Sequence, residues 1–296
     1  MSGVALGALA GVGFGLFQAV NRRVNAALDV YRATFGLCAV GTVLLGVIAL
    51  LTEDVGQIPR APVASLGAFA GAGFLHFFMG WTFLGLSQQR IGAARTGALL
   101  GSMPLFGALG AALVLGEVLA ASALVAVAVV VAGVVAVATS GRRTPVAGGA
   151  GSLTGIAFAL ATAVCWSTSP LLIRIGLRGL ASPLLGVTVG MAATTLVYGV
   201  AIAVLSRRPP AVAVRAVLGS VVVAGTFVGL SIWSYWTALD LAQVGVVLAV
   251  TQLSAPTVAV ASPLLSGDPL ERGGPRLWGG IALIVAGSVA LLLRAG

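Results

Sequence analysis

The chain has 296 residues, of which 59% are hydrophobic and only 8% are charged. Soluble domains carry about 25% charged residues, so this composition excludes an ordinary soluble enzyme or binding domain and predicts a protein embedded in lipid. The basic residues, 16 in number and all Arg, outnumber the 7 acidic residues and give a net charge of +9. In so apolar a chain, Arg at helix ends favours topology signals and anionic headgroups over nucleic-acid binding.

Apolar segments of spanning length follow one another with short loops between them. A membrane-crossing helix needs roughly 20 apolar residues. We therefore expect an all-α polytopic membrane protein with ten transmembrane helices, at about 3–20, 27–51, 63–86, 91–116, 119–139, 152–174, 182–205, 214–239, 243–266 and 276–294. Residues 1–20 carry no charge, unlike the start of a signal peptide, so they are expected to form the first helix.

The first two predicted helices carry polar residues near the loop that joins them. Gln18 and Asn21 come late in the first segment and are candidate contacts for a bound solute. Arg32 opens the second segment and lies deeper than most of the other Arg residues. Its guanidinium could pair with a carboxylate through two hydrogen bonds, or it could extend toward the headgroups, and the sequence leaves both interpretations open.

The third and fourth segments add an ionisable group and a polar site beside a proline. His76, the only histidine, lies inside the third segment, and an intramembrane His that titrates near physiological pH is a candidate for a coupling proton. The alternative is a neutral His that bonds a neighbouring carbonyl. Trp81 is either a cavity wall or a packing residue. In the fourth segment Arg95 lies about one turn inside, and Ser102 precedes Pro104.

The sixth and eighth segments supply aromatic candidates. Trp166 and Pro170 lie in "CWSTSP" of the sixth segment, and Trp233 and Tyr235 lie in "WSYW" of the eighth. Tryptophan occurs both at membrane interfaces and in helix packing, so packing stays an alternative to an aromatic-lined pocket.

The ninth segment contains "TQLSAP" in the middle of an apolar run, with Thr251, Gln252, Ser254 and Pro256. Proline removes a backbone donor and loosens the helix one turn earlier. In lipid the freed groups must be satisfied by protein or water, so this stretch should face the interior. Either it lines a solute cavity or it bonds a neighbouring helix. We predict a central chamber lined by Gln252, Ser254, Ser102, Trp166 and Trp233, with hinges at Pro104, Pro170 and Pro256.

The two halves of the sequence are copies. Placing Pro104 on Pro256, an offset of 152, aligns Ser102 with Ser254 and Trp81 with Trp233. The pattern predicts five-helix repeats at 1–140 and 152–296, joined by a linker at 141–151 that is rich in Gly and Arg. Because five is odd, the second copy must cross the membrane in the opposite sense, which gives the inverted symmetry found in secondary transporters.

The block "WTFLGLS…GAARTGALLGSMPLFGALGAALVLGE", its second-half copy and Arg32 in "YRATFGL" resemble the EamA-type, ten-helix members of the drug/metabolite transporter superfamily. The resemblance implies a multi-pass exporter or permease of small metabolites, such as amino acids, in the cell (inner) membrane. Small multidrug members of this superfamily use a membrane-embedded Glu. Here all seven acidic residues lie near helix ends, which favours anionic or zwitterionic solutes over the alternative, proton-coupled efflux of multidrug-type or other cations.

Other functions fit the sequence less well. An intramembrane enzyme needs catalytic groups within reach of one another, and one His without a mid-span acid does not supply them. A receptor or scaffold would not need a polar midplane. No phosphate-binding loop and no metal-ligand spacing is present, so we expect no catalytic residue, metal or cofactor. Two arguments disagree on the orientation of the protein in the membrane. Twelve Arg residues lie on the side of the odd-numbered loops, counted along the chain, which predicts that the termini are outside the cell. The resemblance implies that the termini are inside.

Overall fold

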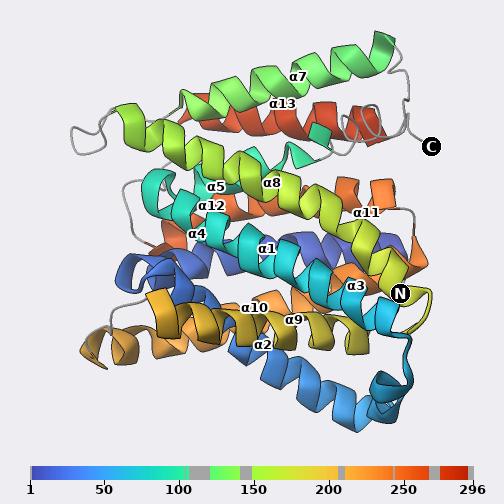
Figure 1. The fold of residues 1–296 in the computed structure, drawn as a ribbon. Coiled ribbons are helices and arrows are strands. Elements are labelled where there is room, and N and C mark those ends of the chain that lie inside the picture. The colour runs from blue at the N-terminus through green and yellow to red at the C-terminus, as the bar shows by residue number, and fades with distance from the viewer. Residues whose placement is uncertain are drawn as a thin grey trace.

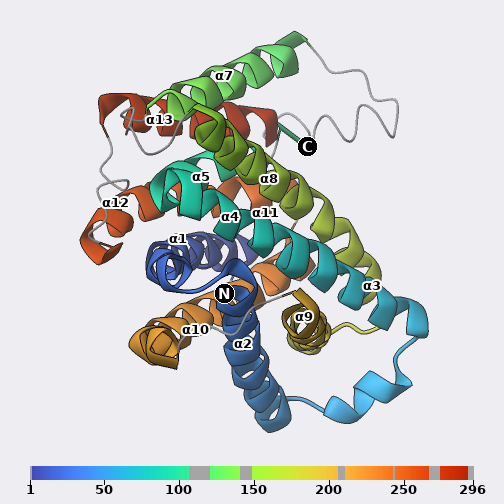
Figure 2. The same ribbon diagram turned by 60° about the vertical axis from the view of Figure 1, so that its left-hand side comes forward.

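The structure is a computed structural model that describes residues 2–103, 105–106, 121–140, 149–205, 211–242, 244–266 and 274–292. Within these residues all regular secondary structure is helical (Figures 1 and 2), as the composition predicted. Long helices pack against one another, and α7 (Ala121–Ala138) and α13 (Pro275–Leu292) form a pair at one edge of the bundle.

The first half of the chain contains a long helical rod with a π-helical segment in its middle. The rod, Val63–Ile91, consists of α3 (Val63–Gly73), a π-helical segment (Phe74–Trp81) and α4 (Thr82–Ile91). Before it come α1 (Gly3–Ala27), α2 (Val30–Thr52) and a short 3₁₀ helix (Val55–Arg60), and after it comes α5 (Ala93–Leu100).

The second half of the chain contains α8 (Gly149–Leu177), α9 (Pro183–Leu205), α10 (Ala211–Leu241), α11 (Val244–Thr251) and α12 (Ser254–Ser266), followed by α13. In the described part of the chain, six helices are long and apolar enough to cross a membrane: α1, α2, the α3–α4 rod, α8, α9 and α10. Shorter apolar helices cover Val125–Val137, Ser254–Leu265 and Pro275–Gly287.

The first helix extends beyond its predicted end at residue 20 and reaches Ala27. The added turns carry Asn21 and Asn25, which are only 3% exposed each because they pack against α4 rather than facing headgroups or water. The hydropathy pattern predicts that the span ends at the first polar residues. The helix instead continues because its polar side chains are buried against α4.

Two segments that the sequence predicts as single spans are interrupted near their middles. α5 ends at Leu100 and is followed by a turn at residues 101–102, while α11 ends at Thr251 and α12 begins at Ser254. Pro256 therefore lies in the first turn of α12, where a missing N–H costs no helical bond. The predicted hinge Pro104, with most of the segment after it, lies outside the described residues.

Pro170 behaves differently from Pro256, because α8 continues through it to Leu177 without interruption. The hydroxyl of Thr168, two residues earlier, donates to the Val164 carbonyl at 3.0 Å. The expected hinge at Pro170 is thus an unbroken helix in this conformation.

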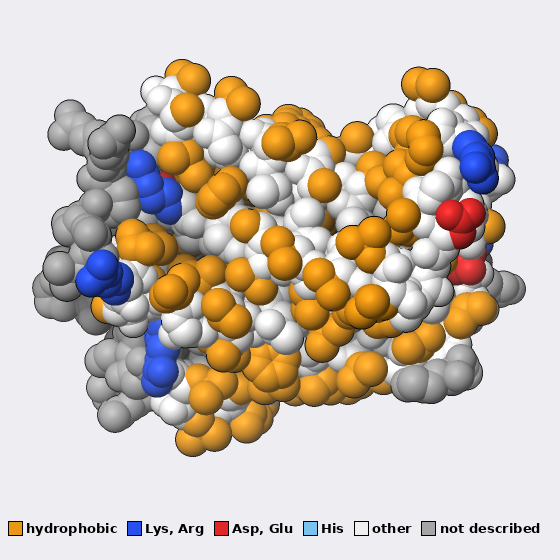
Figure 3. Space-filling view, turned by 90° about the horizontal axis from the view of Figure 1, so that it is seen from below, with side chains coloured by type: hydrophobic (Ala, Val, Ile, Leu, Met, Phe, Trp, Pro, Cys, Tyr) orange, Lys and Arg blue, Asp and Glu red, His pale blue; other side chains and the backbone are white. Residues whose placement is uncertain are grey.

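The surface is apolar between two charged ends. Figure 3 shows Arg side chains at both ends of the long axis, most of the visible acidic side chains at one of them, and a broad uncharged belt between. Large apolar side chains in this belt point away from the protein, among them Leu171, Leu196, Val200 and Leu264, each more than 60% exposed. Such a surface suits lipid as the solvent.

Helices from the first and second halves of the chain pack against each other in antiparallel directions. In the α2–α9 pair, the Thr42 and Thr195 hydroxyls are 3.2 Å apart, and Gly46 approaches the earlier residue Thr188. In the α7–α13 pair, a β-carbon at Gly287 would lie 2.8 Å from Val130. Small residues at these crossings let the backbones approach closely.

The interrupted helices form a third antiparallel pair. A β-carbon at Gly97 of α5 would lie 2.3 Å from a methyl of Val258 on α12. One turn later, a β-carbon at Gly101 would lie 3.3 Å from the Gln252 Oε1 atom. The two interruptions, at residues 101–102 and 252–253, therefore meet in the interior of the bundle.

Candidate functional site

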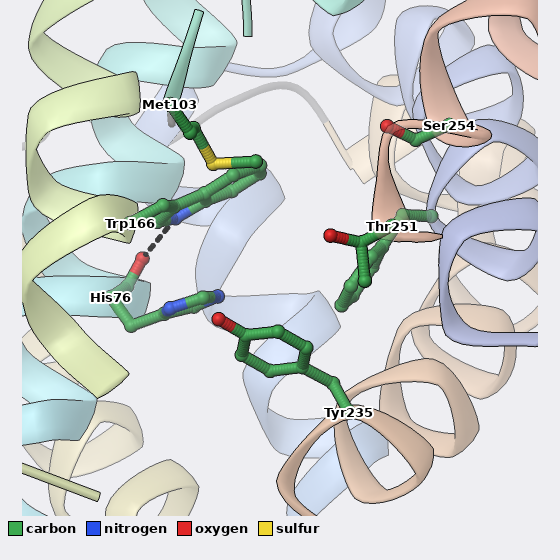
Figure 4. A pocket seen from close by; sticks show the side chains of 7 residues that line it. His76, Met103, Trp166, Tyr235, Thr251 and Ser254 are labelled. Carbon is green, nitrogen blue, oxygen red and sulfur yellow. Dashed lines mark hydrogen bonds between the residues drawn. The ribbon is translucent and has the colours of Figure 1, made fainter. Parts of the chain in front are cut away.

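A cavity lies beside the meeting point of the two interrupted helices (Figure 4). It contains about 330 Å³ of empty space, open solvent at its mouth included, and only a small part of this space is wide enough for a water molecule, so the cavity is narrow in this conformation. Its walls come from α1, the π-helical segment, α8, α10, α11, α12 and the turn after α5. The lining residues are Phe14, His76, Met103, Trp166, Tyr235, Thr251 and Ser254.

His76 is held from two sides by α8. Its Nδ1 atom lies 2.8 Å from the Ser169 hydroxyl, and its backbone carbonyl accepts a hydrogen bond of 2.9 Å from Trp166 Nε1. The imidazole and the Trp166 indole also stack, with ring centroids 5.1 Å apart and planes 12° from parallel. The ring is therefore fixed in orientation, and its Nε2 edge faces the cavity side, toward the Tyr235 hydroxyl (Figure 4).

The π-helical segment that carries His76 is anchored by side chains from the second half of the chain. Besides the Trp166 bond, the Tyr198 hydroxyl donates to the Phe78 carbonyl at 2.9 Å, and the Thr162 hydroxyl donates to the Gly80 carbonyl at 3.2 Å. A β-carbon at Gly80 would lie 2.4 Å from Trp166 Nε1, so only glycine leaves room for the indole. π-helical turns are rare and are frequent at functional sites.

Aromatic rings and hydroxyls form opposite walls of the cavity. Phe14 contacts both Trp166 and Tyr235, with ring centroids 6.4 and 6.0 Å apart. Across from Trp166 and His76, Thr251 and Ser254 present their hydroxyl oxygens from either side of the interruption between α11 and α12 (Figure 4). Because the Thr251 hydroxyl already donates to the Leu248 carbonyl at 3.0 Å, it offers an acceptor to a solute.

Among the sequence-predicted residues, the structure brings His76, Trp166, Tyr235, Thr251 and Ser254 together around this cavity. Phe14 and Met103 also line it. Neither could be predicted from the sequence, because an apolar side chain in an apolar helix gives no signal of its own.

Gln252 and Ser102 lie at the helix interruptions but not on the cavity lining. Gln252 is 1% exposed, and its Nε2 atom donates to the Leu248 carbonyl at 3.0 Å, while its Oε1 atom has no partner. Ser102 is fully buried and donates to the Leu99 carbonyl at 2.7 Å. Both side chains thus cap carbonyls that the interruptions release.

The remaining aromatic and Arg candidates lie away from the cavity lining. Trp81 packs between Phe17 and Phe77, with ring centroids 5.6 and 4.9 Å away, and Trp233 is half-buried on α10. Arg32 pairs with Asp29, the residue that caps α2, at 2.7 Å. This contact occupies Arg32 at the helix end. Arg95 is half-buried in the first turn of α5.

A second polar group lies between α1 and α4, and we call it the carboxamide cluster: Gln18, Asn21 and Asn25 of α1 and Gln88 of α4. Asn21 Nδ2 and Asn25 Nδ2 both donate to Gln88 Oε1, at 3.2 and 3.1 Å. Gln18 is fully buried, and neither atom of its amide has a partner. Gln18 and Asn21 were predicted as site residues, whereas Asn25 and Gln88 were not, although the spacing 18, 21, 25 puts three amides on one helix face.

Acidic groups of the described residues lie at helix ends. Asp29 and Asp54 cap helices, Glu53 accepts a hydrogen bond from Ser182, and Asp240 is next to the last residue of α10. In the described part of the chain, none of the residues that line the cavity is acidic, and no group of three His, Cys, Asp or Glu could hold a metal ion.

An apolar belt, long apolar helices and a polar cavity at two interrupted helices together define a multi-pass membrane protein. A solved crystal structure shares this fold, with a TM-score of 0.65 over 97% of this chain and 96% of that one, at 19% identity. None of the curated proteins matches the chain. Residues 1–139 match the sequence model of the EamA-like transporter family. Over these residues the match confirms the resemblance to this family that the sequence motifs indicated.

Proposed function

We propose that the chain is a secondary transporter of small polar metabolites that works by alternating access around the central cavity. It exports or admits amino-acid-like or other anionic and zwitterionic solutes across the cell (inner) membrane. The observation that carries the proposal is the meeting of two interrupted helices, α5 and α11–α12, beside a cavity walled by hydroxyls, aromatic rings and one His. Interrupted helices near the membrane midplane are where transporters bind their solutes.

Ten spans in two inverted repeats, 1–140 and 152–296, complete the proposal. The antiparallel packing of the helices that pair across the halves supports the inversion. Helices that do not correspond to each other in the repeats also pack in a symmetric way. The first helix of the first half, α1, packs on α10 and α12 of the second half. The first helix of the second half, α8, packs on the matching helices of the first half, the α3–α4 rod and α5. The family match, which ends at residue 139, supports the boundary of the first repeat and a linker at 141–151.

Residues separated by about the repeat offset of 152 also meet in pairs. Thr42 contacts Thr195, Gly101 lies beside Gln252, and Gly133 lies beside Ile284. Residues related by a two-fold axis touch each other only where they lie on that axis. All three pairs come from the middles of their predicted spans, so they support an axis in the membrane midplane, as in other inverted-repeat transporters.

The charges of the described residues favour an anionic or zwitterionic solute. No acid lines the cavity in this part of the chain, so a hydrophobic cation would find aromatic rings but no counter-ion there. Proton-coupled efflux of such cations is the alternative function, and His76 is the group that would carry the proton in either case. Arg95 lies near the end of the bundle and adds to the positive charge that a carboxylate meets before it enters.

The test is transport by the purified protein in proteoliposomes. Radiolabelled amino acids, small organic anions and a hydrophobic cation are compared, each with and without a pH gradient. We expect exchange of an amino-acid-like or anionic solute that protein-free liposomes do not show. Transport of the hydrophobic cation alone would replace the proposal with the efflux alternative.

A further inference from the structure

The carboxamide cluster continues the cavity toward one end of the protein. Phe14, Gln18, Asn21 and Asn25 share one face of α1, at spacings of four, three and four residues. With a rise of about 1.5 Å per residue, Gln18 is about 6 Å and Asn25 about 16 Å beyond the level of Phe14, which lines the cavity. This face of α1 is therefore a buried polar track that begins at the cavity and ends with the helix.

Most amide atoms along the track have no hydrogen-bond partner. These atoms are Gln18 Nε2 and Oε1, Asn21 Oδ1, Asn25 Oδ1 and Gln88 Nε2, in side chains that are at most 3% exposed. Buried polar atoms are nearly always hydrogen-bonded, and leaving one unpaired is costly. A purely structural contact between α1 and α4 would not need four amides, so their free groups indicate a partner from outside the chain.

The geometry of the closed cluster indicates the chemistry of that partner. Two N–H donors, from Asn21 and Asn25, converge on a single oxygen, Gln88 Oε1, at 3.2 and 3.1 Å. A carboxylate oxygen accepts several N–H donors in the same way. The cluster itself is uncharged, and its free Oδ1 atoms can accept from an ammonium group next to that carboxylate.

The end of the protein beside the track attracts anions. Among the described residues it carries seven Arg at the ends of α1, α2, α4, α5, α10 and α13, against one acid, Asp29: the Arg residues are 22, 23, 32, 90, 95, 215 and 276. At the opposite end the described acids and Arg are equal in number, three of each. An excess of one sign around an opening raises the local concentration of solutes of the other sign.

We propose that the carboxamide cluster is a second solute-binding station, between the central cavity and the Arg-rich end, which binds the carboxylate of an amino-acid-like solute. This inference rests on the proposed transport function. In the present conformation Gln88 Oε1 occupies the place of the solute carboxylate and the station is closed. When α4 moves away from α1, the Asn21 and Asn25 donors become free and receive the solute on its way to or from the cavity.

The experiment uses cysteine accessibility in the full-length protein. The native Cys38 and Cys165 are buried and outside the cavity lining, so both are replaced by Ala. Asn25→Cys and, on the opposite wall, Gln88→Cys are then labelled in proteoliposomes with a membrane-impermeant thiol reagent, with and without a mixture of the common amino acids. Ser87→Cys is the matched control, since Ser87 is equally buried on α4 but bonds Thr96 at 2.8 Å.

We expect the reagent to reach Asn25→Cys and Gln88→Cys, and the amino-acid mixture to slow labelling. At about ten times the half-saturating concentration roughly one tenth of the sites stays free, so labelling should slow about tenfold. Ser87→Cys should show no such protection. Radiolabelled uptake of the same mixture by the protein with Asn25 and Gln88 unchanged separates the two proposals. Without uptake, amino-acid transport itself fails. With uptake but no labelling or no protection at both positions, the second station is wrong and transport stands.

Discussion

The central cavity and the carboxamide cluster are both buried and polar, but they differ in how their hydrogen bonds are satisfied. Around the cavity, His76, Trp166 and Thr251 each have a partner within the protein, at 2.8 to 3.0 Å. In the cluster, two donors share one acceptor, and Gln18 has no partner at all. The first arrangement fixes side chains in place, whereas the second leaves hydrogen-bonding capacity unused.

This difference separates a scaffold from a contact that opens. Satisfied polar networks rigidify a site, so the cavity keeps its shape while helices move around it. An interface with unpaired groups is less stable than it could be, and such regions are the ones that open most readily. We infer that the α1–α4 contact opens during transport and that the His76–Trp166 contact does not.

The largest effect on transport should come from breaking the His76–Trp166 contact beside the cavity. Gly80→Ala places a methyl 2.4 Å from Trp166 Nε1, so the indole must leave and the His76 carbonyl loses its partner. We expect a loss of thermal stability of about 1–3 kcal/mol and a nearly complete loss of transport. Thermal unfolding in detergent and proteoliposome uptake measure both. Gly67→Ala is the control, because no atom lies within 4 Å of its β-carbon position; equal behaviour of the two variants would contradict this account.

The next largest effect should come from removing an unpaired amide of the carboxamide cluster. Gln18→Met keeps the length of the side chain but removes an amide whose two polar atoms have no partner. Replacing an unpaired buried polar group by an apolar one should leave stability unchanged or raised. Transport should nevertheless fall roughly tenfold, since a solute loses a hydrogen bond to a charged group. Uptake rates and unfolding temperatures are compared with the unchanged protein. A marked fall in stability would show that Gln18 is structural.

His76→Gln tests whether the fixed imidazole couples transport to protons. The amide can still bond the Ser169 hydroxyl, which lies 2.8 Å from the imidazole, but it cannot take up a proton. We expect uptake driven by a pH gradient to disappear while solute exchange without a gradient continues. Ser169→Ala is the matched control and should keep the pH-driven component. If His76→Gln also keeps it, the residue is structural.

The smallest effect concerns a pair within the α4–α5 corner that is already satisfied. Ser87→Ala removes the hydroxyl that lies 2.8 Å from the Thr96 hydroxyl. Hydrogen bonds between helices in membranes contribute about 0.6–2 kcal/mol, so stability should fall by that amount while the solute affinity stays the same. Chemical or thermal unfolding and the concentration dependence of uptake provide the readouts. A changed affinity would extend the solute path to this corner.

The helical architecture could be predicted from the sequence because each span is set by local composition. "TQLSAP" also predicted a loosened helix, since Pro256 removes a local bond, and the interruption lies three to four residues before it. The π-helical segment could not be predicted. It depends on Trp166, Thr162 and Tyr198, which lie more than 80 residues away in the chain.

The candidate site was predictable where polar residues stand out against an apolar background. Thr251, Ser254 and His76 are of this kind, and all three line the cavity. Asn25 was missed because it lies past the hydropathic end of the first span, and Gln88 because "SQQR" is typical of a helix end near water. Only the packing of α1 on α4 buries these two amides together.

The central claim, that a closed α1–α4 contact must open for transport, can be tested by locking it. Asn25→Cys and Gln88→Cys are combined in the background without Cys38 and Cys165, and a short, cleavable bifunctional thiol reagent joins them. Amino-acid uptake into proteoliposomes is measured before linking, after linking and after cleavage. The account predicts that the uptake left in this double variant stops on linking and returns on cleavage. Undiminished uptake by the linked protein would contradict it.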